Sequence, residues 1–171
     1  MDEAALLRAW SNWDAKSLDD YLAAILKLSK EQRTKDRGAS WGSIQNIFLH
    51  IIEDYIWWFQ NVRQNKKEDS EELVGKDLSQ KELKRLTKQV TSLIRSLASS
   101  LKPSDLGRTY VVHGTSGNGK PYTMTTCLAD IMWHMVEEQL QHIGEINSLF
   151  WQIDVDPPTH AWFSSDLSYT F

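Results

Sequence analysis

The sequence predicts an all-α fold, a bundle of four long helices with a short hairpin or extended loop before the last helix. Four long segments repeat apolar residues at helical spacing. A glycine-rich stretch between β-prone runs separates the last two of these segments. The chain has 171 residues, of which 41% are hydrophobic, enough for one domain with its own core. We therefore expect a single folded domain over residues 1–171.

The first two predicted helices lie in the N-terminal third of the chain. The first runs roughly from Glu3 to Leu28, and a connector is expected after it. The second begins near Ser40 or Ser43, because either serine is a suitable N-cap. Its apolar stripe continues to Val62, so an uninterrupted helix is expected to that point.

The third predicted helix and the hairpin follow a charged stretch. The helix begins at Ser79, because Ser79 and Glu82 have the spacing of a capping box, and it ends before Pro103. The β-prone runs at residues 108–113 and 121–124 flank a loop of turn-forming residues. A short hairpin or an extended loop is therefore expected between the third and fourth helices.

The fourth predicted helix has Thr125 or Thr126 as its N-cap and ends at about Gln152. Beyond it, residues 155–171 form an aromatic tail that we expect to be extended. The tail would pack along the bundle or against a second subunit.

Composition and charge exclude several classes of protein. The net charge is −4 and the basic residues are scattered, which argues against nucleic-acid binding. The single cysteine, Cys127, excludes an intramolecular disulfide and suits a reducing compartment. There is no apolar run of membrane-spanning length and no signal-peptide pattern at the N-terminus. We therefore expect a cytoplasmic protein that has neither membrane nor nucleic-acid partners.

Two polar residues interrupt the apolar stripe of the fourth predicted helix. At about 100° per residue, Glu138 and His142 lie in the middle of that stripe. Burying a carboxylate without a partner is costly, so Glu138 needs one. Two explanations remain open: a satisfied buried pair, or a metal site, since residues four apart on a helix can share one ion. The apolar members of the stripe are Leu128, Ile131, Met135, Ile146 and Leu149.

A third metal ligand would have to come from another helix. His50 lies at the margin of the second helix's apolar stripe, with Asp54 one turn later. It is either a ligand or a surface histidine, and the pattern does not choose. His134 lies about 80° round the helix from His142, and we interpret it as flanking the site or facing solvent. Asp54 is a second possible flanking residue.

Two motifs resemble those of the DinB/YfiT-like family. The stretch from Ser40 to Ile51 resembles the family's second-helix motif, in which a serine-initiated helix carries the first histidine ligand. The stretch from His134 to Ile146 resembles the final-helix motif, where histidines at four-residue intervals precede Arg-Gly-Gln. The resemblance covers about residues 4 to 155, in the same order along the chain.

The resemblance implies an up-down-down-up four-helix bundle, often dimeric, with a divalent metal ion held by three side chains near one end. The ligand positions correspond to His50, Glu138 and His142, with Glu138 in the place usually held by histidine. Ile143 stands where the family has Arg, and Glu145 where it has Gln. The metal would be zinc, nickel, iron or manganese, and the resemblance does not specify which.

The resemblance also implies a function. Similar proteins include thiol S-transferases that use bacillithiol or mycothiol, a thiol-dependent maleylpyruvate isomerase, and proteins that resemble metal-dependent hydrolases. We therefore expect a homodimeric, metal-dependent transferase or hydrolase that acts on a small electrophilic substrate, with a thiol possible as co-substrate. The alternative is a non-enzymatic bundle with a structural polar cluster, whose eight tryptophans serve dimerisation or partner binding.

Overall fold

The computed structural model describes residues 2–62, 72–115 and 119–159. Within these ranges the chain is mostly helical, with five α-helices, one π-helical segment and one two-stranded antiparallel sheet. Because strands are present, a strictly all-α class is not correct. Most of the expected extended tail, from residue 160 onward, lies outside the described residues.

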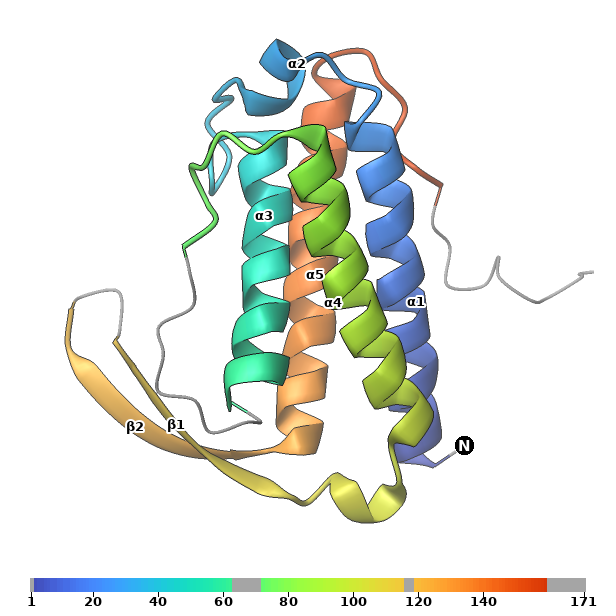
Figure 1. Cartoon of the computed structure of the whole chain (residues 1–171), viewed down its shortest axis with the longest axis vertical. Helices are drawn as coiled ribbons and strands as arrows, with labels where there is room; N and C mark the ends of the chain where they lie inside the picture. The colour runs from blue at the N-terminus through green and yellow to red at the C-terminus, as the bar shows by residue number, and fades with distance from the viewer. Residues whose placement is uncertain (1, 63–71, 116–118, 160–171) are drawn as a thin grey trace, which may run out of the picture.

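The long helices lie side by side (Figure 1), and the sheet lies at one end of them. Helix α1 packs against α4 and α5, and α3 packs against α5. The short α2 (Lys30–Thr34) lies at the opposite end from the sheet and contacts α3. The long helices are α1 (Glu3–Ile25), α3 (Ile44–Tyr55), α4 (Gln80–Ser100) and α5 (Leu128–Trp151).

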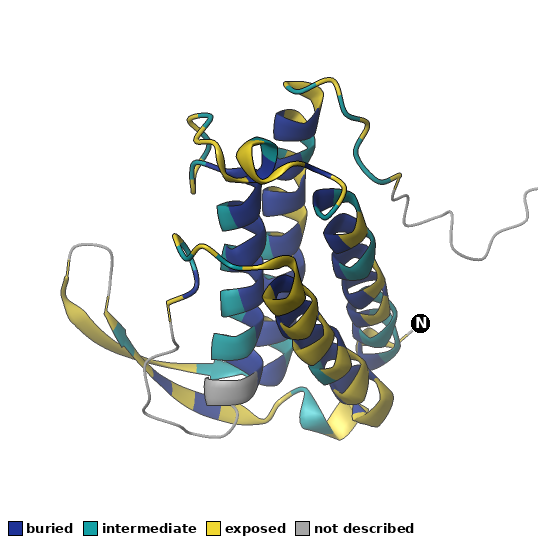
Figure 2. Cartoon of the chain, turned by 45° about the horizontal axis from the view of Figure 1, so that its top comes forward, coloured by how far each residue is buried: buried dark blue, intermediate teal, exposed yellow. Residues whose placement is uncertain are grey.

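The core lies between the long helices. Figure 2 shows that each long helix turns its buried residues toward its neighbours and its exposed residues outward. This division follows from apolar residues at helical spacing, which place one apolar face on each helix. The largest fully buried side chains include Tyr21, Phe48, Tyr55 and Phe150. Helices α1, α3 and α5 therefore all contribute aromatic rings to one core.

The predicted first helix ends earlier than expected, at Ile25, and α2 occupies the predicted connector. Ser29 is the N-cap of α2, and its side chain accepts a hydrogen bond from the Gln32 backbone. The Gln32 side chain accepts one in return from the Ser29 backbone. The sequence therefore contains the capping box that begins this short helix.

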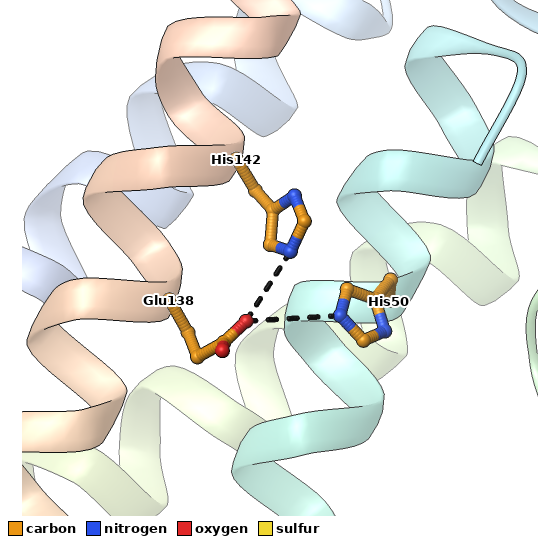
Figure 3. Close-up of side chains that lie close together, drawn as sticks. All are labelled: His50, Glu138 and His142. Atoms are coloured by element: carbon orange, nitrogen blue, oxygen red, sulfur yellow. Dashed lines mark ion pairs between the residues drawn. The ribbon is translucent and has the colours of Figure 1, made fainter. Parts of the chain in front are cut away.

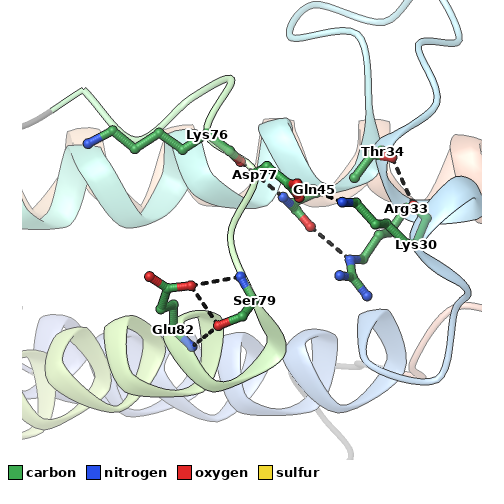
Figure 4. A network of polar contacts seen from close by, with 8 residues as sticks. All are labelled: Lys30, Arg33, Thr34, Gln45, Lys76, Asp77, Ser79 and Glu82. Carbon is green, nitrogen blue, oxygen red and sulfur yellow. Dashed lines mark hydrogen bonds and ion pairs between the residues drawn. The ribbon is translucent and has the colours of Figure 1, made fainter.

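A polar network holds α2 against the starts of α3 and α4 (Figure 4). Arg33 is buried, and its Nε donates a hydrogen bond to Gln45 Oε1 over 2.8 Å. The Gln45 amide in turn donates to the Lys76 carbonyl over 3.3 Å. A surface ion pair between Lys30 and Asp77, at 2.6 Å, joins the same segments. These contacts fix the loop after α1 and thereby the start of α3.

Helix α3 begins at the predicted cap, since Ser43 Oγ accepts a hydrogen bond from the Asn46 backbone at 3.2 Å. It does not continue as an α-helix to Val62, because the π-helical segment η1 (Ile56–Val62) follows it. The wider π turn buries the adjacent side chains of Trp58 and Phe59 together. The expectation of one uninterrupted α-helix is therefore wrong.

The start and end of α4 agree with the prediction. Ser79 and Glu82 form both hydrogen bonds of a capping box (Figure 4). The helix ends before Pro103, which begins a short 3-10 segment at Pro103–Asp105. The missing N–H of proline prevents the helix from continuing.

The hairpin before α5 is formed by β1 (Thr109–Thr115) and β2 (Pro121–Cys127). It confirms the predicted hairpin, but α5 begins later than predicted. Thr125 and Thr126 pair with β1 and do not cap α5. Cys127 is the N-cap instead. The β-branched threonines favour the ladder over the cap, which is the physical reason for this correction.

Candidate metal centre

Three side chains of α3 and α5 come together between these helices (Figure 3). They are His50, Glu138 and His142, and one ligand atom from each lies within 4.8 Å of the others. His142 Nε2 is 3.2 Å and His50 Nε2 is 3.9 Å from Glu138 Oε2. The two helices therefore bring together all three candidate ligands identified in the sequence, at distances that would let them share one ion.

The apolar stripe of α5 explains why its two members point inward. The five apolar residues of the stripe are buried, and His142 is only 5% exposed. Glu138 lies one turn before it, with 24% of its side chain exposed. The stripe packs against α3, so a polar side chain within it must face α3 or the core. His142 is the more deeply buried of the two.

His142 is oriented by a carboxylate on its far side. Its Nδ1 lies 2.7 Å from Glu145 Oε2, which also accepts a hydrogen bond from Ser40 Oγ at 2.7 Å. Burial alone would raise the pKa of Glu145, but the hydrogen bonds from Ser40 and His142 lower it overall. An ionised carboxylate only accepts, so the proton of the imidazole lies on Nδ1. The lone pair of Nε2 therefore faces Glu138.

Two electron-rich atoms thus face one another at the centre of the cluster. His142 Nε2 and Glu138 Oε2 are 3.2 Å apart, and the Nδ1–H of the ring already donates a hydrogen bond to Glu145. A proton shared between these atoms or a metal ion would relieve their repulsion. Because the ligand atom of His50 also converges on this point, the three residues fit a metal ion.

His50 completes the cluster from α3. Burial, together with the nearby His142, lowers the pKa of His50 to about 4, although the charge of Glu145 acts in the opposite direction. The ring is therefore neutral near pH 7 and can offer a lone pair to a metal. Its Nε2 is 3.3 Å from Asp54 Oδ2, and burial, with the charge of Glu138, raises the pKa of Asp54 to about 7. The indole of Trp41 stacks on the His50 ring, with 4.3 Å between centroids.

The two residues interpreted as flanking lie beside the three-residue set. Asp54 contacts His50, as described above. His134 Nε2 is 3.9 Å from Glu138 Oε1, and its ring meets the edge of Trp58 at 5.4 Å between centroids. Neither is among the three residues whose ligand atoms converge.

The sequence predicts the three converging residues but not the three that support them, Glu145, Ser40 and Trp41. Glu145 follows His142 by three residues, so helical spacing alone places the two side chains on one face. Ser40 and Trp41 come from the loop before α3, and nothing in the periodicity indicates where that loop passes. The contact of Glu145 was thus accessible from the sequence, whereas the contacts of the loop were not.

The fold and the site together define a mostly helical protein in which two imidazoles and a carboxylate lie close enough together to hold a metal ion. Comparison with protein families shows that the chain belongs to the DinB family, whose model matches residues 1–163. This match confirms the resemblance carried by the two motifs. A search of curated proteins finds no match. None of the helices in the described ranges has the length and apolarity needed to span a membrane.

Proposed function

We propose that His50, Glu138 and His142 bind one divalent metal ion, and that the protein is a metal-dependent transferase or hydrolase acting on a small electrophilic substrate. The observation that carries this proposal is the convergence of one ligand atom from each residue within 4.8 Å, with His142 Nε2 and Glu138 Oε2 3.2 Å apart. His50 converges on the same point from another helix. A second proton on His142 would neutralise the contact but would give His50 no role.

The donor set agrees with such an ion. Two imidazoles and one carboxylate are ligands of zinc, iron, nickel and manganese, and three protein ligands leave positions open for water or substrate. A divalent ion bound here would act as a Lewis acid and lower the pKa of a coordinated water or thiol, making it a nucleophile near neutral pH. Glu145 keeps the proton of His142 on Nδ1, so that Nε2 is available. Membership of the metal-associated DinB family supports the same assignment.

We further propose that the long helices form an up-down-down-up bundle, that residues 1–171 are one domain, and that the protein is a cytoplasmic homodimer. The apolar side chains that the hairpin exposes support a dimer, because water solvates them poorly. They are Val111, Tyr122 and Met124. Light scattering during gel filtration should give twice the mass of the chain.

The metal proposal is tested by elemental analysis of protein purified without added metal. We expect about one divalent ion per chain, and almost none in His142→Ala, because that variant removes the most buried ligand. The matched control is His113→Ala, since His113 lies on β1, is exposed and contacts Thr123. Circular dichroism should show that both variants keep their helices.

Two results would contradict the proposal in different ways. If the protein takes up no divalent metal even when it is supplied in excess, the metal site is wrong. If metal binds but neither thiol nor water attacks any member of a broad panel of electrophiles, the enzymatic part is wrong. A non-enzymatic protein with a structural metal cluster would then be the better description.

A further inference from the structure

We propose that the metal centre selects ligands whose tail carries a neutral or cationic planar ring, and that the exposed indole of Trp41 is the surface on which the ring binds. This inference rests on the proposed metal site and adds the class of ligand that the site accepts. It combines two independent observations, the position of Trp41 and the charges around the cluster.

Trp41 lies directly beside a candidate ligand. Its ring stacks on the imidazole of His50, with centroids 4.3 Å apart and planes inclined by 30°. A group bound to an ion held by His50 would therefore lie near the indole. Trp41 is also 40% exposed, so part of its apolar surface remains open to a ligand.

The loop that carries Trp41 is held in place. The Trp41 carbonyl accepts a hydrogen bond from the Ser43 backbone at 3.0 Å, and the Gly42 N–H donates to the Ala39 carbonyl at 3.0 Å. Ser40 ties the loop to α5 through Glu145. The indole is thus fixed by its backbone and not by burial in the core. A large exposed aromatic ring that is held next to a polar site is typical of a ligand-binding surface.

The charges around the cluster oppose an anionic ligand. Three carboxylates lie there, namely Glu138, Glu145 and Asp54. Among the residues that the structure describes, the ion-pair contacts of these carboxylates are with histidines, and none is with lysine or arginine. A divalent ion balances the two glutamates, so little positive charge is left for an anionic group on the tail of a bound ligand. A cationic group would instead meet carboxylates and the face of the indole.

Hydroxamic acids with different tails provide the test, because each binds a metal through the same head group. The probes are acetohydroxamic acid, benzohydroxamic acid, and the para-carboxy and para-aminomethyl derivatives of benzohydroxamic acid. Their dissociation constants are measured on the Co²⁺-loaded protein from the visible absorption of the ion. We expect benzohydroxamic acid to bind about tenfold more tightly than acetohydroxamic acid through its ring. We expect the carboxy derivative to bind about fivefold more weakly than benzohydroxamic acid, and the aminomethyl derivative at least as tightly.

Variants connect this preference to the indole. Trp41→Ala should bind acetohydroxamic acid normally but lose most of the gain from the ring, and Trp41→Phe should keep part of it. The matched control is Trp151→Ala, because Trp151 is 60% exposed near the end of α5 and should leave all four constants unchanged.

The outcomes separate this inference from the proposal on which it rests. If Co²⁺ gives no ligand-field bands, or if His142→Ala gives the same bands as the wild type, the metal site itself is wrong, and the inference falls with it. If Co²⁺ binds but the carboxy derivative binds as tightly as benzohydroxamic acid, only the inference is overturned. Survival of the ring preference in Trp41→Ala would overturn it too.

Discussion

The carboxylate of Glu145 determines which nitrogen of His142 faces the cluster. Replacing Glu145 with Ala removes the acceptor for Nδ1, so the imidazole can rotate or carry its proton on Nε2. We expect the metal affinity of Glu145→Ala to fall by about 10- to 100-fold, as is usual for the loss of such a support. Glu145→Gln keeps an acceptor oxygen and should lose less.

Competition with a chromophoric chelator measures these affinities. Glu137→Ala is the matched control, because Glu137 is an exposed neighbour on the same helix. An unchanged affinity in Glu145→Ala would show that the hydrogen bond does not orient the ligand.

A second carboxyl group lies deep in the core, on a helix that supplies none of the three candidate ligands. Asp14 on α1 is 2% exposed, and its Oδ1 has no hydrogen-bond partner in the part of the chain that the structure describes. Burial raises the pKa of Asp14 to about 8, even though the nearby Tyr55 hydroxyl acts to lower it. The folded protein therefore holds Asp14 as a neutral acid near pH 7.

This raised pKa predicts how stability depends on pH. The unfolded chain releases the Asp14 proton near its ordinary pKa of 3.8, while the folded chain keeps it to about pH 8. The contribution of Asp14 to stability is therefore complete below 3.8 and is lost progressively up to about 8. Asparagine cannot ionise, so Asp14→Asn should remove this loss.

We expect Asp14→Asn to raise the melting temperature by about 5 °C or more near pH 8, at 2–4 °C per kcal/mol, and by much less near pH 5. Calorimetry across this range measures the difference. Asp156→Asn is the control, since Asp156 is exposed beyond α5. A melting difference that does not change with pH would contradict the assignment.

Single residues also show how much of the site can be predicted from the sequence. The inward position of His142 follows from its place in an apolar stripe, and this could be predicted because the helical period is fixed. The neutral state of His50 and the contact of Trp41 depend on distances between segments remote in sequence. Periodicity contains no information about such distances.

At the scale of elements, the capping box of α4 offers a local test. Ser79 and Glu82 satisfy each other's backbone N–H groups at the start of the helix. We expect Ser79→Ala to lower the free energy of unfolding by about 1 kcal/mol and the melting temperature by about 2–4 °C. Thermal denaturation followed by circular dichroism measures the change.

The control for this test is Ser92→Ala, because Ser92 is an exposed serine within the same helix. Alanine is the better helix former, so the control should not lose stability. Equal melting temperatures for Ser79→Ala and the wild type would show that the capping box contributes nothing measurable.

The elements differ in how well the sequence predicted them. Helix α4 was predictable at both ends, because a capping box and a proline mark them. The start of α5 was not, since Thr125 and Thr126 are good caps and also good strand residues. Pairing with β1 decided between these possibilities, and pairing is a tertiary interaction. The π-helical segment could not be predicted for a similar reason, because the apolar residues 56–59 fit both the α-helical and the π-helical period.

At the scale of the whole molecule, metal binding should couple to stability. An ion that binds the folded chain alone stabilises it by about 2.7 kcal/mol when its free concentration is 100 times the dissociation constant. We expect the melting temperature to rise by about 5–10 °C under that condition and to return when a chelator is added. Differential scanning fluorimetry over a series of metal concentrations measures the shift.

The variant His142→Ala should show no such rise, because its cluster has lost the most buried ligand. His113→Ala should respond as the wild type does. A shift of equal size in His142→Ala would mean that the metal acts elsewhere on the protein.

The arrangement of the helices was only partly predictable. Four amphipathic segments imply that long helices pack together, but amphipathicity does not say which pairs touch. The resemblance of two short motifs supplied the pairing of His50 with the last helix, and the structure brings these residues together. The exception to the all-α class came from seven residue pairs in the hairpin.

The candidate ligands come from α3 and α5 alone, while α1 and α4 pack chiefly on each other. One pair of helices therefore carries the candidate ligands, and the other pair supports the fold. Random libraries directed at the outer faces of α1 and α4 could be screened for thermal tolerance without disturbing the chemistry. Changes of specificity should instead accumulate on α3, on α5 and on the loop that leads into α3. An engineer could thus treat robustness and selectivity as two separate problems in one small chain.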